Sequence, residues 1–133
     1  MNRIEKAVYY KQNGICNCSE AVIKAYSDLL NIPEDTLVKL GSGFGMGMGT
    51  LEATCGSLIG ANILLGLLND TNKKTTVLSR DLLKEFRILS KATICKELKG
   101  IDTGIVLTPC DICVKNACIS LEKILKENNL LKE

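Results

Sequence analysis

The residues best suited to chemistry in this sequence are its cysteines. The chain of 133 residues contains seven cysteines and no histidine. A cysteine thiolate is both a nucleophile and a soft metal ligand, whereas imidazole, the usual general base and nitrogen ligand, is missing. An odd number of cysteines also argues against a framework made only of disulfides. The chemistry to expect is therefore thiol redox chemistry or metal binding by thiolates.

Four of the cysteines stand where a sulfur could be activated. Cys18 and Cys110 each lie at the start of a predicted helix, where the positive end of the helix dipole favours a thiolate. Cys55 follows a glycine-rich stretch whose backbone amides could approach its sulfur, and Cys95 lies in a short predicted helix. These positions make the four thiols candidates for redox chemistry or for metal ligation.

The other three cysteines are less clearly placed. Cys113 follows Cys110 by three residues, so the two share a helix face, and C-x-x-C at a helix start suits a redox pair or half of a metal site. A four-thiolate zinc ribbon would need a second C-x-x-C, and Cys16 and Cys18 are one residue too close for that. We expect Cys16 in an exposed loop and Cys118 as a small buried hydrophobe.

The glycine-rich stretch "GSGFGMGMGTLEATCGSLIG" covers residues 41–60. It does not match the G-x-G-x-x-G dinucleotide fingerprint, and no lysine follows it as in a P-loop, so phosphate binding is disfavoured. Gly56 and Gly60 are four residues apart and predict close helix packing. Met46 and Met48 are expected in the core or at a contact between subunits.

Apolar residues recur mostly at three- and four-residue spacing, which predicts helices. We expect helices over residues 3–12, from 18 to about 30, over 34–40 and 51–68, from 75 or 76, over 93–98, and from 109 onward. Asn17 and Glu20 form a capping-box pattern, and Thr108 is the expected cap of the last helix. The prediction is all-α: a compact single domain over residues 1–133, with about five to six helices and the glycine-rich segment before a central helix.

Composition disfavours several classes of function. A net charge of +2 gives no electrostatic case for nucleic acid binding. The longest apolar run, residues 58–68, is too short to span a bilayer. The first residues lack the apolar core of a secretory signal, so we expect no membrane role and a cytoplasmic location. Covalent haem attachment is not expected, because Val114 stands where C-x-x-C-H needs histidine.

Four blocks of sequence point together to a known family. "NCSEAV", "GSGFGMGMGTLEATCGSLIGA", "CKELKGID" and "CDICVKNA" resemble, in this order, the C_GCAxxG_C_C family of redox proteins. The resemblance covers residues 17–125 and places the four family cysteines at Cys18, Cys55, Cys95 and Cys110. Cys113 could substitute for Cys110. The sequence is also similar to a domain of split-Soret cytochromes, which carry a cluster site beside their haems.

The resemblance implies redox activity and leaves its chemistry open. The favoured hypothesis is an iron–sulfur cluster, or another thiolate-bound metal, held by the four family cysteines for electron transfer. The glycines Gly45, Gly47, Gly49 and Gly56 would then let backbone amides approach the cofactor. Alternatives are a metal-free thiol–disulfide protein or sensor, a structural zinc site, and a helical interaction module with ordinary buried cysteines. We further expect an unidentified redox partner protein and a homodimer, whereas the choice between enzyme and electron carrier stays open.

Overall fold

The backbone is helical almost throughout. The computed structural model describes residues 1–131 of the chain. Its helices are α1 (Arg3–Gln12), α2 (Cys18–Ala25), α3 (Glu34–Gly41), α4 (Gly56–Leu68), α5 (Thr75–Ser90), α6 (Cys95–Lys99) and α7 (Cys110–Glu127), with the short elements η1 (Ser27–Leu29) and η2 (Gly47–Leu51). The prediction of a compact all-α fold is confirmed, with slightly more helices than the five to six expected.

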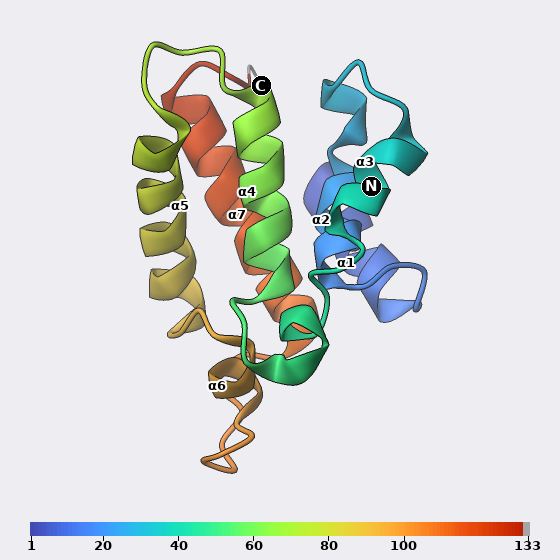
Figure 1. Cartoon of the computed structure of the whole chain (residues 1–133), viewed down its shortest axis with the longest axis vertical. Helices are drawn as coiled ribbons and strands as arrows, with labels where there is room; N and C mark the ends of the chain where they lie inside the picture. Colours follow the sequence, from blue (N-terminus) through green and yellow to red (C-terminus); the bar gives the residue numbers. More distant parts are fainter. Residues whose placement is uncertain (132–133) are drawn as a thin grey trace.

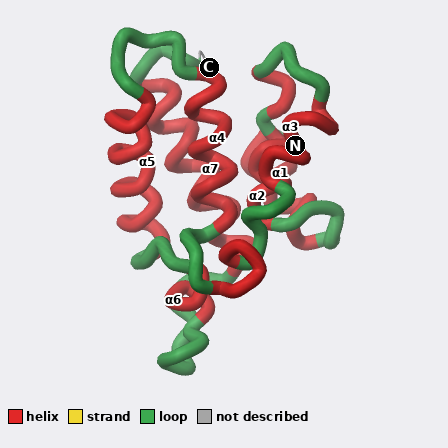
Figure 2. The backbone as a smooth tube through the Cα atoms, viewed as in Figure 1, coloured by secondary structure: helices red, strands yellow, loops and turns green. Residues whose placement is uncertain are grey.

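The helices form two groups that pack against each other. Helices α4, α5 and α7 run side by side, and α1, α2 and α3 lie against them on the other side (Figure 1). The main contacts between the groups join α2 to α4 and α1 to α7. The short helix α6 lies at one end of this arrangement, where the connections leading into α4, α6 and α7 meet (Figure 2). The fold therefore brings three helix starts to one end of the molecule.

The predicted cap of α2 is confirmed. The Asn17 side chain accepts a hydrogen bond from the Glu20 amide at 2.9 Å, and the Glu20 carboxylate accepts one from the Asn17 amide at 2.9 Å. The helix ends at Ala25 rather than near residue 30. The Ser27 hydroxyl donates to the Lys24 carbonyl at 2.8 Å, and this local bond accompanies the change to the short helix η1.

The glycine-rich segment differs from the prediction, because α4 begins at Gly56 and not at Leu51. Leu51 has a left-handed φ of 66°, which cannot continue into a right-handed helix. Beyond it the chain extends and pairs with the segment before α6, through an isolated antiparallel bridge between Thr54 and Ile94. The residues that were expected to form the first turn of the helix serve instead as a paired connection.

The start of α7 differs by one residue. Pro109 takes the capping position in extended backbone, and the helix begins at Cys110. Thr108, the expected cap, is buried, and its hydroxyl donates to the Ser90 carbonyl at 2.8 Å. The first turn of α7 therefore has no side-chain cap.

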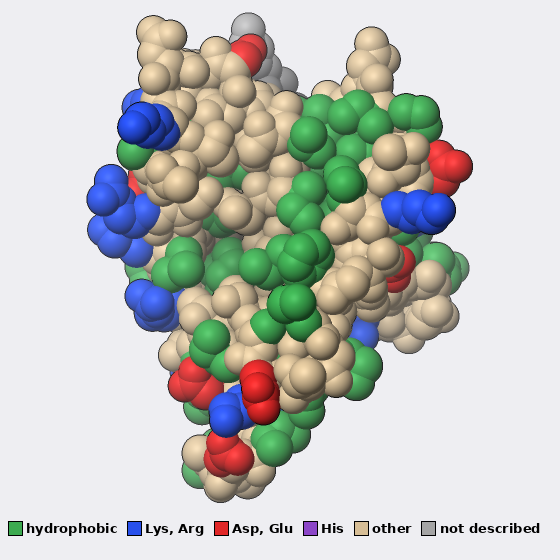
Figure 3. Space-filling model, in the orientation of Figure 1, with side chains coloured by type: hydrophobic (Ala, Val, Ile, Leu, Met, Phe, Trp, Pro, Cys, Tyr) green, Lys and Arg blue, Asp and Glu red, His purple; other side chains and the backbone are tan. Residues whose placement is uncertain are grey.

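The core is mainly aliphatic, as the composition predicts, with Tyr26 and Phe86 as its fully buried aromatic side chains. Met46 and Met48, expected in the core or at a contact between subunits, do not lie in the core of the chain, because their side chains are 55% and 59% exposed. Leu89, in the last turn of α5, is 41% exposed. Apolar side chains gather along the middle of one face, while Lys and Arg lie mainly along the edge formed by α5 (Figure 3). No helix among residues 1–131 is long and apolar enough to cross a membrane.

Glycines in α4 set how closely this helix approaches α2. A Cβ atom at Gly60 would lie 2.7 Å from the Ser19 carbonyl oxygen, which belongs to the backbone of α2. At Gly66, further along α4, the nearest atom to a Cβ would be a Thr75 methyl carbon at 3.8 Å. An alanine would therefore disturb helix packing at Gly60 but not at Gly66, while the change in intrinsic helix propensity is the same at both positions.

We expect Gly60→Ala to lower the free energy of unfolding by about 1–3 kcal/mol, because the added methyl group forces α2 and α4 apart. Gly66→Ala is the matched control. It should raise the free energy of unfolding by up to about 1 kcal/mol, because alanine is the better helix former and finds room there. Urea denaturation followed by circular dichroism measures both. Equal effects of the two substitutions would contradict close α2–α4 packing.

Candidate functional site

Five cysteines line one small pocket at the end of the molecule where the helix starts meet. They are Cys18, Cys55, Cys95, Cys110 and Cys113, and Lys11, Asn17, Met46, Gly56 and Lys99 complete the lining. The space at its centre is about 20 Å³, room for about one water molecule. The structure thus brings together the four cysteines expected from the sequence and adds a fifth. We call this site the cysteine pocket.

Each pocket sulfur lies at or just inside a helix start. Cys18, Cys95 and Cys110 are the first residues of α2, α6 and α7, and Cys55 is the residue immediately before α4. Helices α4, α6 and α7 have no side-chain cap, so the amides of their first turns are not satisfied by capping side chains. Unsatisfied amides and the positive end of a helix dipole both favour negative charge on a nearby sulfur.

Backbone pairing fixes Cys55 and Cys95 next to each other. The Cys55 amide donates to the Thr93 carbonyl at 2.7 Å, and the Cys95 amide donates to the Ala53 carbonyl at 3.0 Å. These two bonds flank the bridge between the connections that lead into α4 and α6. Both side chains are buried, with 5% of Cys55 and 6% of Cys95 exposed.

Two of the four predicted glycines touch the cysteines directly. A Cβ atom at Gly56 would lie 2.6 Å from the Cys18 sulfur, and one at Gly47 would lie 2.8 Å from the Cys95 Cβ. Gly45 packs against the Asn17 side chain, where a Cβ would lie 2.6 Å away. Gly49 has no such neighbour within 4 Å, but its φ of 78° is left-handed. The absence of side chains lets the glycine-rich backbone lie against the sulfurs.

Cys55 is the most acidic of the shifted thiols. The pKa of Cys55 is lowered to about 6, and the largest cause is a hydrogen bond from the Cys113 thiol. Burial acts in the opposite direction. Hydrogen bonds from the Ser57 side chain and from the amides of Ser57 and Leu58 lower the pKa further. The Cys55 sulfur and the Ser57 oxygen are 3.0 Å apart. The thiolate of Cys55 therefore has donors from its own helix and from α7.

Cys113 is the pocket residue that the family pattern does not contain. Its thiol faces Cys55, which raises the pKa of Cys113, and burial acts in the same direction. The same thiol lies 3.6 Å from the Thr108 carbonyl. The Ser57 hydroxyl donates to the Cys113 carbonyl at 3.2 Å, so Ser57 joins the first turns of α4 and α7. The C-x-x-C spacing with Cys110 was the signal in the sequence that could have placed it here.

Burial dominates at two other pocket cysteines. It raises the pKa of Cys18, although the Met46 amide and the Lys11 charge act in the opposite direction. Burial also raises the pKa of Cys95, opposed by the charge of Lys99. Cys110 is half-buried at the edge of the pocket. The pocket thus favours one thiolate, at Cys55, over ionisation of Cys18 and Cys95.

The last two cysteines lie outside the pocket. Cys16 is in the turn before α2, as expected, but it is half-buried rather than exposed. Cys118 is fully buried, as predicted, and burial raises its pKa to about 12. Its neighbour Tyr26 donates a hydrogen bond to Glu122. Neither thiol is placed to act with the five pocket cysteines.

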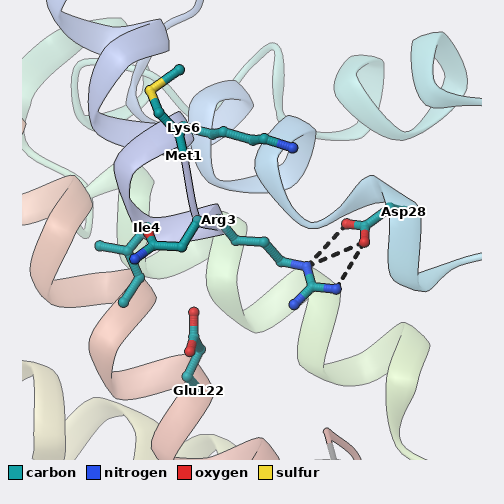
Figure 4. A pocket seen from close by; sticks show the side chains of 7 residues that line it. Met1, Arg3, Ile4, Lys6, Asp28 and Glu122 are labelled. Carbon is teal, nitrogen blue, oxygen red and sulfur yellow. Dashed lines mark hydrogen bonds and ion pairs between the residues drawn. The ribbon is translucent and has the colours of Figure 1, made fainter. Parts of the chain in front are cut away.

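A wider pocket of about 400 Å³ lies at the start of α1, at a distance along the fold from the cysteines. Figure 4 shows Arg3 reaching across to Asp28, and these two form an ion pair of 2.8 Å. Glu122, which also lines this pocket, accepts the Tyr26 hydrogen bond. The charged groups here tie α1 and α7 to the segment after α2, so we assign this pocket a structural role.

The sequence of this chain matches the model of a known family. The family model described as "Putative redox-active protein (C_GCAxxG_C_C)" matches residues 16–124. The chain belongs to the C_GCAxxG_C_C family. The matched residues include all five cysteines of the pocket and most of α7. Neither the comparison with curated proteins nor that with solved structures gives a match.

Within this C_GCAxxG_C_C protein, the acidity of Cys55 can be tested by titration. In the reduced, metal-free protein we expect one thiolate with an apparent pKa of about 6, ionised above that pH and protonated as the pH falls through it. Thiolate absorbance in the ultraviolet measures it. Ser57→Ala should raise this pKa because it removes a hydrogen bond to the Cys55 sulfur.

Two serine substitutions control this titration. Cys55→Ser should remove the acidic thiolate, whereas Cys118→Ser should leave it, because the Cys118 thiol is protonated at neutral pH. An acidic thiolate that survives in Cys55→Ser would show that another cysteine carries it.

Proposed function

We propose that this redox-family protein binds an iron–sulfur cluster through Cys18, Cys55, Cys95 and Cys110 and transfers electrons to a partner protein. The observation that carries the proposal is that four cysteines from four separate helix starts line the same pocket. Four cysteine thiolates are the usual ligand set of two-iron and four-iron clusters. Bound there, a cluster would supply one-electron chemistry.

The donor set fits such a cluster in type and number. Among residues 1–131, no three Cys, Asp or Glu side chains stand close enough together to surround a single metal ion. A structural zinc site would need four thiolate sulfurs about 2.3 Å from one ion. A cluster distributes its cysteines over several iron atoms. Because the central space is about 20 Å³, the sulfurs would have to move apart on loading.

The protein's own residues would tune such a site. Buried thiols at Cys18 and Cys95 have raised pKa values, so ligation would release their protons. The Met46 amide beside Cys18 and the uncapped first turn of α7 would stabilise negative charge on the sulfurs. Lys11 and Lys99 add positive charge at the edge of the pocket. These groups favour the reduced state of a bound redox centre, which carries the additional electron.

A homodimer remains part of the proposal, in a changed form. The small-residue face of α4 packs within the chain, since Gly56 contacts Cys18 and Gly60 contacts Ser19. This face of α4 is therefore covered by α2 and does not support a contact between two copies of the chain. The exposed side chains of Met46 and Met48 are the remaining argument, and Met46 lines the cysteine pocket.

We expect the anaerobically purified protein, after reconstitution with iron and sulfide, to show sulfur-to-iron charge-transfer bands in the visible spectrum. Cys55→Ser should abolish these bands, because it removes a ligand at the centre of the pocket. Iron and acid-labile sulfide are to be counted on the same samples.

Cys118→Ser is the control for general damage, because Cys118 is buried outside the pocket; it should keep the cluster. A colourless wild-type protein after reconstitution would refute the cluster. Bound zinc in that sample would then favour the structural metal site, and a protein free of metal would favour thiol–disulfide chemistry.

A further inference from the structure

The Ser57 hydroxyl lies beside one of the proposed ligands, although Ser57 does not line the pocket itself. We propose that this hydroxyl donates a hydrogen bond to the Cys55 sulfur once that sulfur is ligated, and so raises the reduction potential of the bound centre; this role rests on the proposed function. Two observations carry it: the short distance from the Ser57 oxygen to the Cys55 sulfur, and a second acceptor that competes for the same proton.

The Ser57 hydroxyl has partners at the starts of two helices. Its oxygen lies 3.0 Å from the Cys55 sulfur, next to α4, and 3.2 Å from the Cys113 carbonyl oxygen in α7. A hydroxyl has one proton to donate and two lone pairs that accept. While Cys55 is a thiol, its S–H can donate to the Ser57 oxygen and the hydroxyl can donate to the Cys113 carbonyl, so both contacts are satisfied.

Ligation of Cys55 changes which contact the Ser57 proton serves. A metal-bound sulfur is a thiolate, so it can only accept, and the Ser57 hydroxyl is a donor 3.0 Å away. Hydrogen bonds to ionised acceptors are about twice as strong as those between neutral groups. The Ser57 proton therefore turns from the Cys113 carbonyl to the Cys55 sulfur.

A hydrogen bond to a ligating sulfur acts on the reduction potential. The reduced state carries the additional negative charge, so a donor at the sulfur stabilises it more than the oxidised state. Ser57 is fully buried and only 5% of Cys55 is exposed, so bulk water cannot supply the same donor. The low polarity of the surroundings strengthens the hydrogen bond further.

Ser57 also joins α4 to α7, and a purely structural role for its hydroxyl is the alternative. The two roles differ in what the hydroxyl changes. A structural hydroxyl contributes to the free energy of unfolding and leaves the potential of the bound centre unchanged. A hydroxyl that donates to the ligating sulfur shifts that potential.

The test is a redox titration of the anaerobically reconstituted protein, followed by its visible spectrum. We expect Ser57→Ala to take up the cluster and to show a midpoint potential more negative than that of the wild type. Ser120→Ala is the matched control, because Ser120 is also buried, lies outside the pocket and has no hydrogen-bond partner for its hydroxyl among residues 1–131. It should keep the wild-type potential.

A second measurement needs no substitution. Resonance Raman spectra of wild-type protein unfolded and reconstituted in ordinary water and in heavy water should differ in their iron–sulfur stretching frequencies, because deuterium replaces the proton bonded to the sulfur. Identical frequencies would overturn the hydrogen bond even where Ser57→Ala does not fold.

The outcomes separate this role from the proposed function. A folded Ser57→Ala protein that loads the cluster and keeps the wild-type potential would overturn the role of Ser57 and leave the proposed function intact. An equal shift in Ser120→Ala would also overturn it, because the loss of any buried hydroxyl would then have the same effect. A wild-type protein that takes up no cluster would refute the proposed function and this role with it.

Discussion

A cysteine sulfur stands only one methylene group away from the backbone, so sulfurs from separate helices can share a small pocket only when their backbones come close. The structure meets this requirement with glycine. Gly56 leaves room for the Cys18 sulfur, and Gly47 leaves room for the Cys95 side chain. The antiparallel bridge between Thr54 and Ile94 then holds the connection into α4 next to the connection into α6. The rest of the fold can be described as the support that holds these backbones together.

Electrostatics in the pocket is a balance between burial and oriented amides. Burial disfavours a thiolate, and it dominates at Cys18 and Cys95. At Cys55 the donors of Ser57 and the Cys113 thiol outweigh it. The pocket therefore holds one negative charge readily by itself. Burial opposes further negative charge at Cys18 and Cys95, so a metal ion bound there would have to compensate for that effect.

The sequence predicts the local features of this fold well, because they depend on neighbours in the chain. The capping box of Asn17 and the start of a helix at residue 75 are examples. Features that depend on distant residues were missed. Helix α4 starts late because the residues before it pair with the segment before Cys95. Thr108 does not cap α7, because its hydroxyl donates a hydrogen bond to the Ser90 carbonyl instead. The C-x-x-C spacing places Cys113 near Cys110, but only the packing of α7 against α4 brings it into the same pocket as Cys55.

The pocket also constrains when the site can come into existence. Its cysteines span the chain from Cys18 to Cys113, so most of the polypeptide must be synthesised before the last sulfur is in place. During translation the earlier thiols are exposed on an incomplete chain, because the helix that covers them has not yet emerged. The complete set of pocket sulfurs can therefore come together only after Cys113 has been synthesised. The cysteine pocket therefore forms only when the helices from α2 to α7 have packed together.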